Sequence, residues 1–338
     1  MRKKLTMVFV VCQILVLAYM AGEREYILYA GEKIVLRTAP IDPRDVFRGD
    51  FVRLNYDISS TPVDRLQGDV KDKIRQKDYL VYSVLKKLDG GLSEVDFITD
   101  KEPDEGVYLR GRVNTHWRFR NRAQLLRVRY GIEQLFVEQG AGLEIEKRRG
   151  KRRGLQIPME VEVAVSSNGK SVIKGYRWSP LGIQLEVLRA PRIRRGENAE
   201  QLPLSPRVRL SLQNVSGEPI VLFDPGDHCG IKLVPAERNQ RDYQQSYQGC
   251  ENVQLSESSQ ISLNPEQKYS IEIDFTEPRW HLRHAGKIDE LGELPNFDRF
   301  RLVYQSPSAS QLKTSGLEGN VWLGALSSSS FNNRGNID

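Results

Sequence analysis

Cysteine and histidine are scarce in this sequence, and their scarcity narrows the chemistry available to the chain. Only three cysteines and four histidines occur among 338 residues. No C-x-x-C pair and no cysteine–histidine ladder is present, so the patterns typical of zinc sites are missing. His281 and His284 are three residues apart, but no carboxylate or thiol ligand stands at a fitting interval. We therefore expect neither a metal nor another cofactor.

Excess positive charge is also small once the first residues are set aside. The formal net charge is +6, and Arg2, Lys3 and Lys4 supply three of these charges, which leaves 6 − 3 = +3 for the rest of the chain. Such a balance is too small to indicate a nucleic-acid-binding protein from bulk charge. We expect no nucleic-acid partner.

Long apolar runs are limited to one segment at the N-terminus, "LTMVFVVCQILVLAYMAG", residues 5–22. As a helix it would be about 27 Å long, close to the roughly 30 Å thickness of a bilayer core. The basic residues before it favour a cytoplasmic N-terminus and export of the remainder. The small-x-small pattern of a cleavage site is poor, which favours an uncleaved signal anchor over a cleaved signal peptide. The sequence thus predicts a single-pass protein of the cytoplasmic membrane, with its bulk extracytoplasmic.

The two cysteines outside this segment fit export. Cys229 and Cys250 enclose a loop of about 20 residues, and a disulfide between them would add roughly 3 kcal/mol of stability in the chain-entropy model. The alternative is two unrelated buried thiols. Cys12 lies within the apolar segment and does not indicate lipidation.

Strand-like alternation dominates the chain from Tyr26 onward. β-branched and aromatic residues alternate with charged ones, and Gly, Pro, Asn or Asp separate the runs. Short helices are expected only at 62–77 and 132–147. A proline-containing stretch near residue 190 breaks the pattern, and short, evenly spaced strands follow it.

The predicted fold class is therefore mainly β, with an N-terminal transmembrane helix. The second β region resembles a small immunoglobulin-like or fibronectin-like sandwich, and the serine-rich end has a solvated composition. The predicted domains are an anchor at 1–24, a β-rich extracytoplasmic domain at 25–189, a linker at 190–206, a β-sandwich at 207–305 and a mostly disordered tail at 306–338.

The stretch "PRDVFRGDFVRLNY", residues 43–56, combines a turn with the start of a strand. Gly49 can adopt a positive φ, and Asp50 would then enter the strand from a sharp turn. Alternation places Val52, Leu54 and Tyr56 on one face. A structural role explains the stretch without any ligand.

This stretch resembles the namesake motif of the GDYXXLXY membrane-anchored protein family. Gly49, Asp50, Leu54 and Tyr56 match, whereas Phe51 replaces the tyrosine. "RYGIEQLFVEQGAGLEIE", residues 129–146, is similar to a second segment of that family, with Tyr130, Gly131 and Glu133 as its matching residues.

The resemblance covers about residues 5–190 and implies an N-terminal anchor with a β-rich domain outside the cytoplasm. It implies no activity, because the family's biochemical role is uncharacterised. Members are often encoded near multi-pass membrane proteins, which suggests a membrane partner. The basic run 147–153 and the added region from 207 onward depart from the family pattern.

Catalytic alternatives are weaker. A signal-peptidase-like mechanism needs a nucleophilic serine near the membrane end of the domain, but the earliest serines after the anchor are Ser59 and Ser60. A carboxylate-dependent envelope hydrolase could pair Asp50 with Glu133 or Glu138. Because these carboxylates can equally be solvated or paired with arginine, we expect no catalytic residues.

Positive charge is concentrated in "EKRRGKRRG", residues 146–154, where the glycines suggest a flexible exposed loop. It could contact anionic lipid headgroups or an anionic envelope polymer, or it could simply be a solvated loop. The sequence favours a non-catalytic binding or assembly partner of an envelope or membrane component. The predicted basic patch consists of Lys147, Arg148, Arg149, Lys151, Arg152 and Arg153.

Overall fold

The structure is a computed structural model of the full chain. The structure describes residues 2–38, 51–73, 78–113, 125–151, 153–189, 205–236, 243–246, 249–250, 253–317 and 319–337. Among these residues, strands account for 42% and helices for 22%, so the fold is mainly β, as predicted.

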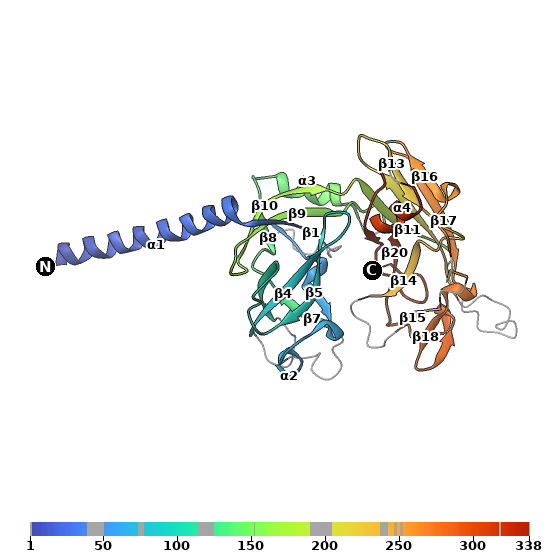
Figure 1. The fold of residues 1–338 in the computed structure, drawn as a ribbon, viewed down its shortest axis with the longest axis horizontal. Helices are drawn as coiled ribbons and strands as arrows, with labels where there is room; N and C mark the ends of the chain where they lie inside the picture. The colour runs from blue at the N-terminus through green and yellow to red at the C-terminus, as the bar shows by residue number, and fades with distance from the viewer. Residues whose placement is uncertain are drawn as a thin grey trace.

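A single long helix, α1 (Arg2–Ala30), projects from the β-rich body as a separate rod (Figure 1). Its segment Thr6–Ala30 is long and apolar enough to cross a membrane, and the most apolar part of that segment is not buried in the molecule. The helix continues past residue 22, where the predicted span ends, and includes residues 26–30, which the sequence pattern assigned to a strand. The reason is that this end of α1 packs on the body, where Ile27 is buried.

The joint between α1 and the first strand is one residue long. The Gly31 N–H donates to the Ile27 carbonyl at 2.9 Å, and β1 begins at Glu32. Glu23 also forms an ion pair with Lys170 of the body. The helix is therefore held against the first strands rather than connected through a free linker.

Among the residues described between 31 and 178, the first unit of the body has ten strands in antiparallel sheets. Strand order is β1-β9-β10 in one sheet, β3-β7-β6-β4-β5 in another, and β2-β8 in a third. The strands are β1 (Glu32–Arg37), β2 (Phe51–Arg53), β3 (Ser60–Pro62), β4 (Leu80–Lys87), β5 (Ser93–Thr99), β6 (Tyr108–Val113), β7 (Leu125–Arg129), β8 (Gln134–Phe136), β9 (Met159–Val165) and β10 (Ser171–Trp178), with helices α2 (Val70–Lys73) and α3 (Ala141–Arg149).

One hydrophobic core joins these sheets. Alternation along β1 directs Ile34 and Leu36 inward, with the period of two expected for a half-buried strand. The central strand β9 is buried on both faces, and its Val161 and Val163 join the same core. The helix predicted at 132–147 is only partly present, because residues 134–136 pair with β2 as a strand and the helix begins at Ala141.

The second unit is also built from antiparallel sheets, with orders β11-β12-β17, β13-β16, β14-β20-β21 and β15-β18-β19. Its elements are β11 (Leu181–Arg189), β12 (Arg207–Asn214), β13 (Ile220–Phe223), β14 (Ile231–Pro235), β15 (Gln244–Gln245), β16 (Gln260–Leu263), β17 (Lys268–Asp274), β18 (Leu282–His284), β19 (Lys287–Asp289), β20 (Phe300–Gln305) and β21 (Ala325–Ser327), with helix α4 (Ala309–Thr314).

The strand β11 differs from the expected domain division. Sequence analysis placed it at the end of the first domain, whereas it pairs with β12 along its length and contributes Leu181, Ile183 and Leu185 to the core of the second unit. Alternation predicts a strand here but not its partner. The finer expectation of an immunoglobulin-like sandwich stays a prediction.

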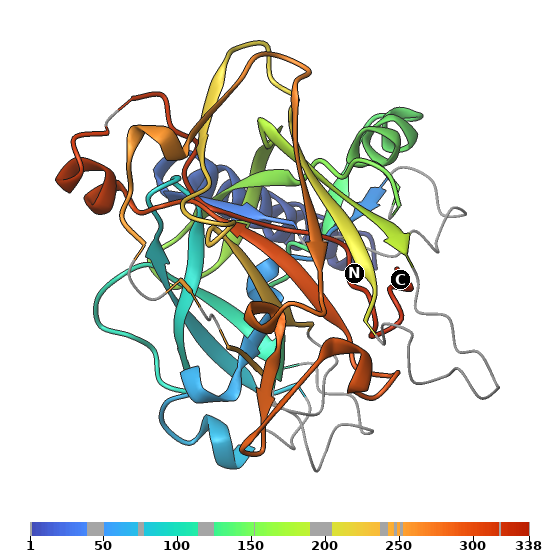
Figure 2. The ribbon, with the colours of Figure 1, turned by 90° about the vertical axis from the view of Figure 1, so that its right-hand side faces the viewer.

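The C-terminal segment also differs from the expected disordered tail. Residues 306–317 and 319–337 are ordered, with Trp322 and Phe331 buried in the core of the second unit. Ser328 of the serine run is buried, and its hydroxyl accepts the Leu302 N–H at 3.0 Å. The serine-rich segment, whose composition suggests exposure to solvent, is therefore hydrogen-bonded at the edge of the core. Figure 2 shows this red segment running through the body rather than away from it.

The C-terminal segment also joins the two units. Arg37 of β1 lies over the Trp322 ring, with its guanidinium carbon 5.8 Å from the ring centroid, and donates to the Ala325 carbonyl. The Ala309 N–H donates to the Asp89 carboxylate at 2.8 Å. The C-terminus accordingly lies between the units in Figure 1.

Candidate functional site

The two family-like segments identified in the sequence lie side by side. Strands β2 and β8 pair antiparallel, with Phe51 opposite Phe136 and Arg53 opposite Gln134. Beyond the strands, the Leu54 N–H donates to the Glu133 carbonyl at 2.8 Å. Segments about 80 residues apart in the chain therefore form one local structure. Of the predicted motif residues, Gly49 and Asp50 lie outside the described residues.

The motif tyrosines are buried and bonded to the backbone. The Tyr56 hydroxyl donates to the Ile132 carbonyl at 2.7 Å, and the Tyr130 hydroxyl donates to the Ile58 carbonyl at 3.1 Å and bonds to the Ser83 hydroxyl at 2.8 Å. Burial, followed by the Glu133 carboxylate, raises the pKa of Tyr56. Burial raises the pKa of Tyr130 as well. Both phenols therefore remain protonated donors at neutral pH.

Glu133 closes the turn that contains Tyr130 and Gly131. Its two carboxylate oxygens accept the N–H groups of Tyr130, at 2.6 Å, and Gly131, at 3.0 Å. Gly131 adopts a φ of +83°, a conformation that favours glycine. The carboxylate thus completes a turn. Asp50, the partner required by the hydrolase hypothesis, lies outside the described residues, and Glu138 is exposed.

Phe51, which replaces the family's tyrosine, lies at the surface of the motif. Its ring centroid is 6.2 Å from that of Phe136, and Phe136 is 73% exposed. Leu54, by contrast, is buried on the opposite face with Val52. The predicted alternation of the motif strand is therefore present. Residue 51 belongs to its partly exposed face.

The predicted basic patch begins on a helix rather than in a loop. Lys147, Arg148 and Arg149 form the last turn of α3, where positive side chains interact favourably with the helix dipole. Gly150, at a φ of +86°, ends the helix. Lys151 and Arg153 follow it, and Arg152 lies outside the described residues. The glycine that suggested flexibility instead acts as a helix terminator.

Aromatic residues of β10 lie beside this helix end, a neighbour that the sequence pattern does not predict. The Arg148 guanidinium carbon is 5.3 Å from the centroid of the Trp178 ring. Tyr176 contacts Trp178 edge to face at a centroid distance of 6.2 Å. Tyr176 is 41% exposed. Sequence separation hid this pairing, because α3 and β10 are about 30 residues apart.

Cys229 and Cys250 form a disulfide, with 5.6 Å between their Cα atoms. Next to it, the Asp224 carboxylate accepts from the Tyr269 hydroxyl at 2.6 Å and lies 2.5 Å from His228 Nδ1. This buried carboxylate network was not recognised in the sequence. Asp224 is buried, and the loop at His228 adopts a φ of +68°. The network fixes the loop that carries Cys229.

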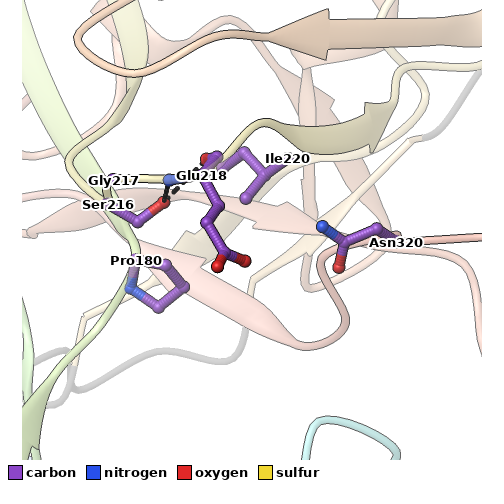
Figure 3. A pocket seen from close by; sticks show the side chains of 6 residues that line it. All are labelled: Pro180, Ser216, Gly217, Glu218, Ile220 and Asn320. Carbon is purple, nitrogen blue, oxygen red and sulfur yellow. Dashed lines mark hydrogen bonds between the residues drawn. The ribbon is translucent and has the colours of Figure 1, made fainter.

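Other chemistry-bearing arrangements are sparse in the part of the chain that the structure describes. No group of three or more His, Cys, Asp or Glu side chains there is arranged to hold a metal ion. An open hollow of about 590 Å³ is lined by Pro180, Ser216, Gly217, Glu218, Ile220 and Asn320. Figure 3 shows the Glu218 carboxylate between Pro180 and Asn320, without a second acid–base group among the residues drawn.

Comparison with known proteins finds a family model that matches most of the first unit. Residues 13–175 match the family model described as GDYXXLXY protein. No curated protein and no solved structure matches the chain. The matched region contains α1 from residue 13 onward, both motif segments, strands β1 to β9 and the start of β10, whereas the second unit lies beyond it. Through residues 13–175, the chain is similar to the GDYXXLXY protein family.

Proposed function

We propose that this chain is a non-catalytic, membrane-anchored extracytoplasmic protein that serves as a binding or assembly partner of an envelope or membrane component. The observation that supports this most is the continuity of α1, which passes without a break from an exposed apolar span into a helical end packed on the body. Such a helix holds the body in a fixed position close to the bilayer.

The direction of insertion follows from charge and redox chemistry. Basic residues precede the apolar span and favour a cytoplasmic N-terminus. The disulfide between Cys229 and Cys250 fits an oxidising compartment on the other side. Residues 23–30 extend the helix by about 12 Å beyond the predicted span at 1.5 Å per residue. The body would thus begin just outside the headgroup region.

A binding role is favoured because the motif residues have structural tasks. Tyr56, Tyr130 and Glu133 use their polar groups to bond backbone atoms of neighbouring turns. Groups committed in this way are poorly placed to exchange protons with a substrate. The family motif would therefore stabilise the fold of the β-rich unit that follows the anchor. The partner of this unit would be a multi-pass membrane protein or an anionic envelope polymer.

Localisation of the full-length chain tests this function. After cell fractionation, we expect the chain in the membrane fraction, with an intact mass that includes residues 1–24. Alkylation before and after reduction should show Cys229 and Cys250 protected until reductant is added. In spheroplasts, external protease should digest the body. A soluble cytosolic chain with both thiols free would overturn the proposal.

A further inference from the structure

The surface at the end of α3 combines exposed cations with aromatic rings. We call the set Lys147, Arg148, Arg149, Tyr176 and Trp178 the aromatic–basic patch. Two of its members are already in contact, because the Arg148 guanidinium lies over the Trp178 ring. Stacking of this kind orients the planar guanidinium while leaving its N–H groups available in the plane. Arg148 is exposed and makes no hydrogen bond or ion pair with any residue that the structure describes.

The positive charge of this surface is incompletely neutralised. The described residues 141–151 and 153 include five cationic side chains and two carboxylates, Glu144 and Glu146, so their net charge is 5 − 2 = +3. Arg149 adds buried polar atoms to this surface. Its Nε and Nη2 atoms are buried and have no hydrogen-bond partner among the described residues. Burial lowers the pKa of Arg149, and Glu146 opposes that change. An anion bound at the surface would compensate this charge.

The location of the patch decides between the two anionic partners considered from the sequence. Gly31 lies beside Val165, and Trp178 pairs with Met159, six residues further along β9. Six strand residues span about 20 Å at 3.3 Å each. Strands β1 and β9 continue roughly in the direction of α1 (Figure 1). With the 12 Å of emerging helix, the patch lies about 30 Å from the apolar span.

That distance is unfavourable for lipid headgroups. Electrostatic attraction between exposed charges is screened within about 10 Å at 0.1 M ionic strength. A polymer that extends away from the bilayer can reach the patch, whereas headgroups cannot. Nucleic acid is disfavoured by the exported location. The remaining class is an anionic polymer of the envelope.

From these observations we infer that the aromatic–basic patch binds an acidic polysaccharide. Sugar rings present a flat face of C–H groups that packs on an aromatic ring, and Tyr176 offers such a ring at 41% exposure. Carboxylates on neighbouring sugars match the fork of N–H groups on Arg148. An acidic polypeptide would satisfy the charge but would not specifically require Tyr176. This inference rests on the proposed export and anchoring.

Binding of the purified full-length chain in detergent micelles tests the inference. The probes are polygalacturonate, neutral dextran, polyglutamate and phosphatidylglycerol vesicles. We expect polygalacturonate to bind and dextran not to bind. Arg148→Gln should weaken binding about tenfold, because it removes a charge-assisted bidentate contact. Tyr176→Ala should weaken it about fivefold.

Arg283→Gln provides the matched control, because Arg283 is an exposed strand arginine in the second unit. It should bind polygalacturonate like the wild-type chain. Unchanged thermal unfolding of all three variants would show that folding is intact.

The inference would be overturned by no binding of polygalacturonate, by an equal loss in the Arg283 variant, or by polyglutamate binding as tightly without dependence on Tyr176. Arg148-dependent binding to vesicles would overturn the distance argument and, with it, the inference. A cytosolic chain in fractionation would instead overturn the proposed function. A membrane-anchored chain that fails to bind the polymer would overturn this inference alone.

Discussion

At the residue scale, Tyr56 and Phe51 occupy the same motif in opposite environments. Tyr56 is fully buried, and its hydroxyl donates to the Ile132 carbonyl at 2.7 Å. Tyr56→Phe removes that donor and leaves a buried acceptor without it. We expect a loss of about 1–2 kcal/mol in the free energy of unfolding. Urea unfolding of the full-length chain in detergent, followed by tryptophan fluorescence, measures the change.

Phe51→Tyr is the matched control, because it changes the molecule by the same single hydroxyl and restores the family's residue. The ring at position 51 is only partly buried and contacts the exposed Phe136. The added hydroxyl can reach solvent, so we expect a stability change within about 0.5 kcal/mol. Equal effects of the two substitutions would contradict the structural role assigned to Tyr56. An activity or ligand affinity gained with Phe51→Tyr would instead indicate a binding role for that position.

At the scale of elements, Gly31 makes the joint between α1 and β1. A Cβ atom at this position would lie 2.4 Å from the Ile27 carbonyl oxygen and 3.0 Å from that of Val165, both backbone atoms. Gly31→Ala therefore forces the helix end away from β9. We expect a broader distribution of distances between a spin label on α1 and one on the body. Double electron–electron resonance on the chain in nanodiscs measures this distribution. Faster proteolysis near residue 30 should accompany the change.

Gly22→Ala is the control for that joint, because no atom lies within 4 Å of a Cβ built there. Alanine also favours a helix over glycine by about 1 kcal/mol. The distance distribution should stay as narrow as in the wild-type chain. If Gly31→Ala gave the same narrow distribution, the body would not be held by the helix end.

The sequence predicted local elements better than their partners. Runs of β-branched and aromatic residues between turn residues identified the strands that became β4, β6, β9 and β12, although of these only β6 alternates in burial. The same pattern could not assign β11 to the second unit, since pairing is decided by tertiary contacts. For the candidate site, the motif and the cysteine pair were visible in the sequence. The stacking of Arg148 on Trp178 was not, because it depends on how α3 packs beside β10.

Composition predicts exposure to solvent poorly where polar side chains are buried with hydrogen-bond partners. The serine run suggested a solvated tail, yet Ser328 bonds the Leu302 N–H and Ser329 donates to Gln156 at 2.9 Å. Small hydroxyl side chains can be buried at low cost when each forms a hydrogen bond. The informative signal was the spacing of Trp322, Leu326 and Phe331 around the serines, which supplies the apolar contacts that hold the segment in place.

At the scale of the whole molecule, the family unit and the added unit share a contact centred on Arg37. Its guanidinium forms a 2.9 Å ion pair with Glu160, lies over Trp322 and donates to the Ala325 carbonyl. The side chains of Arg37 and Glu160 are 9% and 5% exposed. The pair with Glu160, within the first unit, holds the guanidinium in place, and its contacts with Trp322 and Ala325 favour one arrangement of the two units, because any other arrangement loses them. The body is therefore expected to move as one piece on its helix.

Arg37→Ala tests that coupling. Removing one partner of a buried pair leaves Glu160 with only its bond to Arg177 at 2.8 Å, and we expect a loss of about 3 kcal/mol in the free energy of unfolding. Differential scanning calorimetry should show the transitions of the two units further apart than in the wild-type chain. Arg209→Ala is the control, because Arg209 pairs with Glu186 and Glu272 on an exposed sheet face, where such pairs contribute within about 1 kcal/mol. Similar transitions in both variants would mean that other contacts, such as that between Ala309 and Asp89, hold the units together without the arginine.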